Sequence, residues 1–197
     1  MKKILVLATF NAHKAAEILA ILPRLRLEPR TLADFPGAAP AEEDGLTLEE
    51  NAVKKAAAAA GFTGEWALAD DTGLEVDALG GAPGVRSARF AGGSSSPAAN
   101  NALLLSRLEE VPPERRTARF VCVVALASPE GKVFTAKGLL EGRITDGARG
   151  GAGFGYDPLF ELPDGRTLAE LSEAEKNAVS HRARALAGLL PRLLALR

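Results

Sequence analysis

The chain of 197 residues is poor in cysteine, in aromatic residues and in net charge. Its single cysteine, Cys122, lies in the apolar run RFVCVVAL, so an internal disulfide is excluded and a buried, inert thiol is expected, as suits a reducing compartment. A formal net charge of -1 and an aromatic content of 5% do not match the basic surface and interleaved rings of an RNA-binding module. Affinity for anions must therefore come from local clusters of cations.

Long apolar runs are also lacking, because no stretch approaches the roughly 20 apolar residues of a membrane span. The opening MKKILVLATF is short, is followed by polar NAHK and shows no small-residue cleavage site, so it predicts a first strand rather than a secretory signal. We expect a cytoplasmic protein that binds neither membrane nor nucleic acid. With 47% hydrophobic residues the chain can bury a core, and a single α/β domain over residues 1–197 is expected.

Helix and strand signals alternate along the chain. Asn11 is expected to cap a helix that reaches about Leu22, and Thr47 with Glu50 predicts a capping box before an alanine-rich helix that ends near Gly61. The other expected elements are strands at 25–31 and 66–69, an exposed loop at 34–45, a helix from 97 to about 108 and a hairpin over 117–144 with its turn at 129–131. A glycine-rich loop is expected at 146–158, followed by a helix from about 173 that breaks near 180 and bends or ends a turn at 191.

Two adjacent aspartates, Asp70 and Asp71, follow the strand predicted at 66–69. Neighbouring carboxylates repel each other unless a cation or hydrogen-bond donors compensate, and a strand end before a glycine turn is where α/β sheets place ligand sites. Successive strand residues point to opposite faces, so we expect one aspartate to face a site for a divalent metal and the other to cap the turn. A solvated turn is the alternative. A haloacid-dehalogenase-type phosphatase does not fit, because position 72 is threonine and its motif needs aspartate there.

Three further stretches carry polar groups suited to a nucleotide. TFNAHK, residues 9–14, opens the first predicted helix, where exposed amides attract phosphate, although an ordinary cap with a surface lysine is the alternative and no Walker or Rossmann glycine motif is present. GGAGFGYDP, residues 150–158, holds aromatic rings among glycines, which suits stacking on a base or burial in the core. EKNAVSHRARAL places Lys176, His181 and Arg182 on one helical segment, where they line one mouth or form a solvated face.

In this order, the pieces TFNAHK, EEDGLTLEENAVKKA, ALADDTGLEVDALGGAPGVRSARFAG, GFGYDP and EKNAVSHRARAL resemble the inosine triphosphate pyrophosphatase (Ham1/RdgB-like) family over nearly the whole chain. The resemblance implies an α/β fold with a long mixed central β-sheet flanked by helices, two lobes around a central nucleotide-binding cleft, and a homodimer. It also implies Mg²⁺-dependent hydrolysis of the purine nucleotides ITP, dITP and XTP to monophosphate and pyrophosphate, which removes non-canonical nucleotides from the pool.

The resemblance also implies roles for particular residues. Asp71 corresponds to the catalytic acid/base and metal-associated aspartate, and Glu42 to the second metal-associated carboxylate, with Glu43 as the alternative one position on. The residues implied to bind substrate are Thr9, Phe10, Asn11, Ala12, His13, Lys14, Lys55, Thr72, Phe154, Gly155, Tyr156, Asp157, Lys176, His181 and Arg182. The expected reaction is attack of water on the α-phosphorus, with donors from His181, Arg182 or backbone amides selecting a 6-keto purine.

The sequence departs from the family pattern at four places. Phe10 replaces the usual glycine, Thr72 the usual serine, and Arg86 and Phe90 the usual tyrosines. A Maf-type pyrophosphatase acting on dTTP or UTP is the nearest alternative enzyme, but GFGYDP and SHR favour the purine substrate. A nucleotide sensor without catalysis is the alternative from another class.

Overall fold

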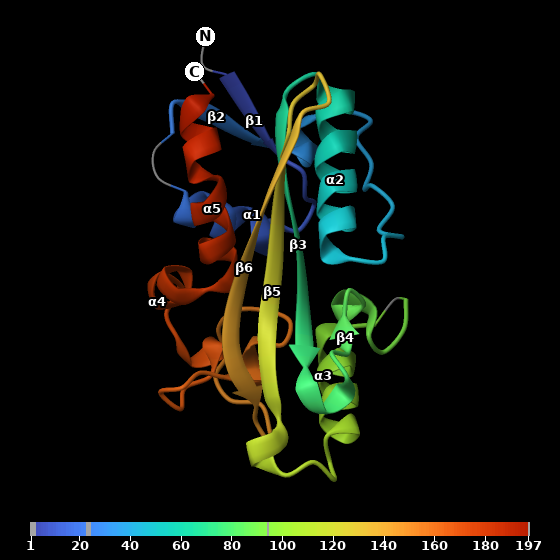
Figure 1. The fold of residues 1–197 in the computed structure, drawn as a ribbon, viewed down its shortest axis with the longest axis vertical. Coiled ribbons are helices and arrows are strands. Elements are labelled where there is room, and N and C mark those ends of the chain that lie inside the picture. Colours follow the sequence, from blue (N-terminus) through green and yellow to red (C-terminus); the bar gives the residue numbers. More distant parts are fainter. Residues whose placement is uncertain (1–2, 23–24, 94, 197) are drawn as a thin grey trace. The chain divides into compact units, whose positions relative to one another are not determined.

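The structure, a computed structural model, describes residues 3–22, 25–93 and 95–196 (Figure 1). Its sheet has the strand order β2-β1-β3-β5-β6-β7, with β4 paired to β3. Strand β1 is parallel to β2 and β3, whereas β4 is antiparallel to β3 and β7 to β6, so the predicted mixed α/β class is confirmed. The strands are β1 Lys3–Leu7, β2 Leu27–Thr31, β3 Trp66–Val76, β4 Pro83–Gly84, β5 Thr117–Ala127, β6 Val133–Ile144 and β7 Phe160–Glu161; the helices are α1 Ala12–Ile21, α2 Leu48–Thr63, α3 Pro97–Arg107, α4 Glu173–Val179 and α5 His181–Ala195.

Two compact units make up the chain. Unit 1 comprises Met1–Asp71, Cys122–Gly138 and His181–Arg197, and unit 2 comprises Thr72–Val121 and Leu139–Ser180. Strands β3, β5 and β6 contribute residues to both units, so neither unit is a continuous stretch of chain. The expectation of a single domain over residues 1–197 stays a prediction.

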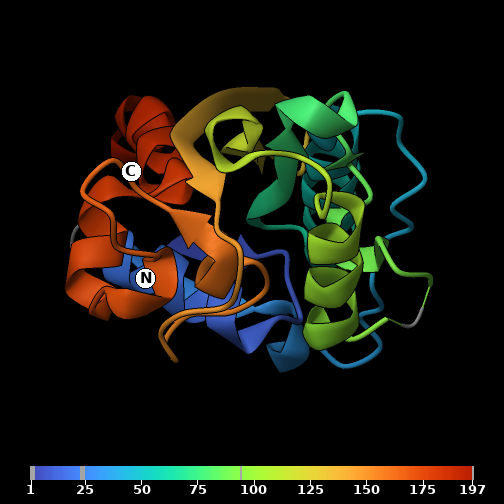
Figure 2. The ribbon, with the colours of Figure 1, turned by 90° about the horizontal axis from the view of Figure 1, so that it is seen from below.

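Unit 1 buries its strands between helices. Figures 1 and 2 show α5 and α2 on different sides of the strands of this unit (Figure 1, Figure 2). Alternation along the strands explains this, because Leu5, Leu7 and Leu68 join one core cluster with residues of α1 and α5, whereas the small buried side chains of α2 lie near β1 on the other face. Four apolar residues of α5 belong to the core of unit 1, namely Ala185, Leu186, Leu189 and Leu193, whereas Leu194 is exposed. Cys122 is buried in the same cluster, as expected.

Unit 2 has its own core. Residues of α3 pack with β5 and β6, and the rings of Phe120 and Phe160 lie with their centroids 4.7 Å apart. Tyr156 and Leu159 bring the glycine-rich loop into this core. Of the two aromatic residues in that loop, Tyr156 is therefore a core residue, whereas Phe154 is half-buried.

Strand β3 is longer than the sequence predicts. The expected strand ends at residue 69, but β3 runs from Trp66 to Val76 and contains both aspartates in its interior. The expectation that one of them caps a turn is therefore wrong. The sequence Asp-Asp-Thr-Gly has the composition of a turn, but here it forms part of a strand in which cations compensate both carboxylates.

Helix ends follow the expected chemistry with three differences. The Thr47 hydroxyl accepts a hydrogen bond from the Glu50 N–H at 3.1 Å, but the Glu50 carboxylate accepts from the Leu46 N–H at 2.7 Å, so the second half of the capping box falls one residue early. Helix α2 continues past Gly61 to Thr63 and ends at Gly64, whose φ of 71° is left-handed. Helix α5 continues through Pro191 to Ala195.

The break expected near Ser180 is present. Ser180 is extended, with φ -64° and ψ 155°, and separates α4 from α5. Because of this break, Lys176 belongs to unit 2, whereas His181 and Arg182 begin the last segment of unit 1. The expectation that these three side chains share one helical segment is wrong.

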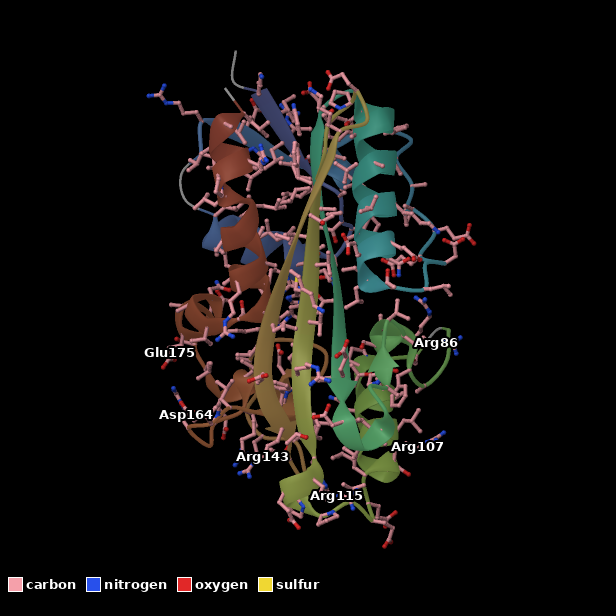
Figure 3. The ribbon with its side chains drawn as sticks, in the orientation of Figure 1. Arg86, Arg107, Arg115, Arg143, Asp164 and Glu175 are labelled. Atoms are coloured by element: carbon pink, nitrogen blue, oxygen red, sulfur yellow. The ribbon has the colours of Figure 1, made fainter. Side chains whose placement is uncertain are left out.

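The surface of unit 2 carries exposed ion pairs. Arg166 donates hydrogen bonds to Asp164 and to Glu175, and Figure 3 shows these two acidic residues at the same side of the unit (Figure 3). The carboxylate of Glu175 also accepts from the N–H and hydroxyl of Ser172 and so completes the capping box of α4. Within the described ranges, no helix combines the length and hydropathy needed to cross a bilayer.

Candidate active site

The start of α1 presents a corner of polar groups after β1. The Asn11 side chain caps the helix by accepting from the N–H groups of His13 at 3.0 Å and Lys14 at 3.2 Å, and the Thr9 hydroxyl accepts from the Asn11 N–H at 3.1 Å. Asn11 and His13 are exposed, as is Phe10. A helix N-terminus with exposed residues and a lysine in its first turn is suited to bind phosphate.

Asp71 lies on the face of β3 that α2 covers. Its carboxylate accepts a hydrogen bond from the Lys55 ammonium at 2.8 Å through Oδ1, and one from Asn51 Nδ2 at 3.3 Å through Oδ2. Asn51 and Lys55 stand four residues apart and therefore lie on one side of α2. Asn51 is held in turn, because its Oδ1 accepts from the Gly45 N–H at 2.8 Å. An added Cβ at Gly45 would lie 2.5 Å from that oxygen, so only glycine fits this approach.

A second carboxylate reaches the same ammonium. The Lys55 Nζ atom also lies 2.8 Å from Glu43 Oε1, so it bridges Glu43 and Asp71. Burial would lower the pKa of Lys55, but Asp71 and Asp70 outweigh this effect and raise it above its ordinary value. Lys55 is therefore fully charged at neutral pH. The hydrogen bond from Lys54 to Asp44 is the main cause that raises the pKa of Lys54, and Glu42 adds a smaller contribution. The contact with Lys55 places Glu43 beside Asp71, and the choice between Glu42 and Glu43 as a metal-associated carboxylate stays a prediction.

Asp70 lies on the opposite face of β3 and has a separate set of partners. Its Oδ2 atom lies 3.1 Å from the Lys14 ammonium and 3.0 Å from the Arg182 guanidinium, which also contacts Glu17. Burial alone would raise the pKa of Asp70, but Lys14, Arg182 and Lys55 hold it well below its ordinary value. Burial has the opposite effect on Arg182 and by itself would lower its pKa. The charge of Asp70 outweighs this effect, so the pKa of Arg182 is raised above its ordinary value. Both groups are ionised at neutral pH.

These contacts explain how two adjacent aspartates are tolerated in one strand. The side chains point to opposite faces, as strand geometry predicts, and each carboxylate meets its own cations. Repulsion between them is thus compensated on both faces of β3.

Unit 2 holds the other group of candidate residues in the loop before β7. The Asp157 carboxylate accepts from the Phe154 N–H at 2.8 Å and from the Lys176 ammonium at 2.6 Å, and that ammonium lies 4.6 Å from the centroid of the Phe154 ring. Two longer-range hydrogen bonds fix the loop: Tyr156 donates its hydroxyl to the Ser87 carbonyl at 2.8 Å, and Asn101 Nδ2 donates to the Gly155 carbonyl at 3.1 Å.

His181 and Arg182 begin α5 in unit 1, and both are buried. Strand β6 approaches the first turn of α5 so closely that an added Cβ at Gly138 would lie 2.1 Å from the His181 carbonyl oxygen. Glycine at position 138 therefore sets where the His181 backbone lies against β6.

The structure adds residues that the sequence interpretation missed. Asn51, Glu17, Ser87 and Asn101 each hold a candidate site residue by a hydrogen bond or ion pair. The sequence could have indicated Asn51, since it precedes Lys55 by about one helical turn and so shares its side of the predicted helix. For the other three no signal was available, because their contacts join distant parts of the sequence.

The fold and these contacts define a class of protein: a mixed α/β protein in which two carboxylates and a lysine form a compact polar cluster suited to a polyanionic substrate. The chain belongs to the Ham1 family, whose family model matches residues 5–192.

Individual relatives agree with this assignment. The chain is 58% identical over 184 residues to the dITP/XTP pyrophosphatase of Geobacter sulfurreducens, covering 93% of this chain and 92% of that one, and 55% identical over 183 residues to the dITP/XTP pyrophosphatase of Desulforamulus reducens, covering 92% and 91%. Among solved structures, the HAM1 protein from Coxiella burnetii matches with a TM-score of 0.88 and 41% identity, covering 98% of this chain and 99% of its own. The resemblance inferred from the motifs is thereby confirmed.

Proposed function

We propose that the protein hydrolyses non-canonical purine nucleoside triphosphates, namely dITP, ITP and XTP, to the monophosphate and pyrophosphate. The observation that carries the proposal is the cluster of Asp71, Lys55 and Glu43 in a chain whose relatives are named dITP/XTP pyrophosphatases. A nucleoside triphosphate brings about four negative charges, which repel both an attacking water and any carboxylate unless cations neutralise them.

Asp71 and Glu43 suit Mg²⁺ as ligands. The described residues contain no group of three or more histidine, cysteine, aspartate or glutamate side chains placed to hold a metal, and Mg²⁺ does not need one, since it binds through one or two carboxylates, water and substrate phosphates. Both carboxylates have an oxygen 2.8 Å from the Lys55 ammonium, so a cation is already accommodated between them. Bound there, Mg²⁺ would neutralise phosphate oxygens and make water more acidic.

Asp71 acts as the general base in this proposal. It orients a water molecule and accepts its proton while the water oxygen attacks the α-phosphorus; the bond between that phosphorus and the bridging oxygen breaks, and pyrophosphate leaves with the electron pair. No covalent enzyme intermediate is required. Lys55 and the residues from Thr9 to Lys14 bind the triphosphate, and the Thr72 hydroxyl, next to Asp71 in β3, contacts the substrate.

Recognition of the base is assigned to two groups of residues. In unit 2, Phe154 offers a ring face, and Gly155 to Asp157 with Lys176 offer polar groups. In unit 1, His181 and Arg182 or the amides near them supply donors. A 6-keto purine presents an acceptor at O6 and a donor at N1, whereas adenine presents the reverse, so donors placed for O6 leave adenine unmatched.

Pyrophosphate release from a nucleotide panel tests the proposal. With Mg²⁺ present, we expect kcat/KM for dITP and XTP to exceed that for dATP by about 100-fold or more, and release to stop in EDTA. Preference for dTTP or UTP would instead support the Maf-type activity. Binding of dITP without release would identify a nucleotide sensor.

Assembly and location are proposed on the resemblance. We expect a homodimer, which sedimentation equilibrium measures directly, and a cytoplasmic location, where nucleotides for DNA and RNA synthesis are found. A monomer at micromolar concentration would contradict the first expectation.

A further inference from the structure

Asp70 is not among the residues that the proposed chemistry uses, yet it is one of the most buried charged groups of the chain. Its side chain has 0% exposure, and the Arg182 side chain beside it has 1%. Replacing a buried ion pair by apolar residues is often neutral or stabilising. Stability alone therefore does not explain a charge in this position.

The contacts of Asp70 connect three elements of unit 1. Its Oδ2 atom on β3 lies 3.1 Å from Lys14 on α1 and 3.0 Å from Arg182 on α5, and Arg182 also contacts Glu17, which follows Lys14 by three residues on α1. These two cations and two anions form one network. Lys14 belongs both to this network and to the corner that begins α1, and its side chain keeps 19% of its surface exposed.

We infer that Asp70 is a positioning residue, which holds the Lys14 ammonium in place to receive the polyphosphate while Asp71, the next residue on β3, faces the reacting centre. This inference rests on the proposed function, since it assigns Lys14 to the substrate. A lysine side chain has several rotatable bonds, and ordering it on binding weakens affinity. The ion pair with Asp70 orders the side chain before the substrate arrives, and β3 fixes its distance from Asp71.

The sign of the effect separates positioning from simple electrostatics. Asp70 is an anion, so by its charge alone it repels a polyphosphate, and its removal would tighten binding. If Asp70 positions Lys14, its removal weakens binding instead. The weakening must also vanish when Lys14 is absent, because Asp70 then has no ammonium to place.

The test is a double-mutant cycle read by titration calorimetry with inorganic tripolyphosphate and Mg²⁺. It compares the unmodified protein, Asp70→Asn, Lys14→Met and the double variant. We expect Asp70→Asn to raise the Kd for tripolyphosphate about three- to tenfold when Lys14 is present, and to change it less than about twofold in the Lys14→Met background. Asp77→Asn, the same substitution at an exposed aspartate just beyond β3, is the matched control and should leave Kd unchanged.

Tighter or unchanged binding by Asp70→Asn would overturn the inference. So would equal weakening in both backgrounds, which is the result for a purely structural role, and so would an unmodified protein that does not bind tripolyphosphate. If Asp70→Asn does not fold, Asp70→Glu takes its place: the charge is kept, so electrostatics alone predicts no change in Kd, whereas displacement of Lys14 predicts weaker binding that disappears with Lys14→Met.

Hydrolysis of dITP by the unmodified protein is measured alongside. Coupling between Asp70 and Lys14 in a protein without hydrolysis would contradict the proposed function alone. Hydrolysis without this coupling would contradict the positioning role alone.

Discussion

Replacement of Asp71 by asparagine tests the proposed chemistry at one atom. Both carboxylate oxygens of Asp71 accept hydrogen bonds, from Lys55 and from Asn51. An asparagine there supplies one acceptor, so its NH₂ group must face a donor. Asn51 cannot turn its amide to help, because its own oxygen accepts from the Gly45 N–H at 2.8 Å.

The size of the effect follows from these contacts. One charge-assisted hydrogen bond is weakened and one donor is left without an acceptor, while Lys55 keeps Glu43, so we expect a loss of about 2–4 kcal/mol in the free energy of unfolding. That leaves a folded protein if the total lies in the usual range of about 5–15 kcal/mol. Loss of the base should lower kcat for dITP by about 10²- to 10⁴-fold. The Kd for dITP should change much less, because Lys14 and Lys55 remain.

Urea unfolding, pyrophosphate release and calorimetry measure the three quantities. Asp77→Asn is again the control. The exposed ion pair of Asp77 with Arg119 should contribute only about 0–1 kcal/mol to the free energy of unfolding, and its loss should leave kcat unchanged. A kcat for Asp71→Asn within about tenfold of the unmodified protein, below the range expected for loss of a general base, would refute the assignment of Asp71.

Three more predictions concern the fold. Leu189→Ala, in the core of unit 1, should lower the free energy of unfolding in urea by about 2–5 kcal/mol, and an effect below about 1 kcal/mol would contradict its packing. Lys14 and Arg182 depress the folded-state pKa of Asp70, so its contribution to stability is complete above the unfolded-state pKa of about 3.9 and is lost at lower pH. The free energy of unfolding should therefore fall less below about pH 4 in Asp70→Asn than in the unmodified protein, and an equal fall would contradict this linkage. Buried Cys122 should react with a maleimide only after unfolding, and rapid labelling of the native protein would show that it is accessible.

Strand periodicity was enough to predict that Asp70 and Asp71 face opposite ways. It could not show that both lie inside β3, because local composition favours a turn and the compensating cations come from α1, α2 and α5. Tertiary contacts overrode local preference there. The motifs correctly indicated the family, because each is a short run of residues that can be recognised in the sequence even where its contact partners lie far along the chain.

The choice between Glu42 and Glu43 shows a second limit. Adjacent glutamates in a loop have no periodicity to separate them, and the direction of each side chain depends on where Lys55 lies. The helix break at Ser180 was predictable, but its consequence was not, because only the fold assigns Lys176 to one unit and His181 with Arg182 to the other.

If the protein directs water to the α-phosphorus of a purine nucleoside triphosphate, the oxygen atom of that water must end in the monophosphate. Mass spectrometry of the products formed from dITP in ¹⁸O-labelled water measures where this oxygen goes. We expect one ¹⁸O atom in dIMP and none in pyrophosphate. Label in pyrophosphate, or formation of dIDP and inorganic phosphate, would contradict this expectation.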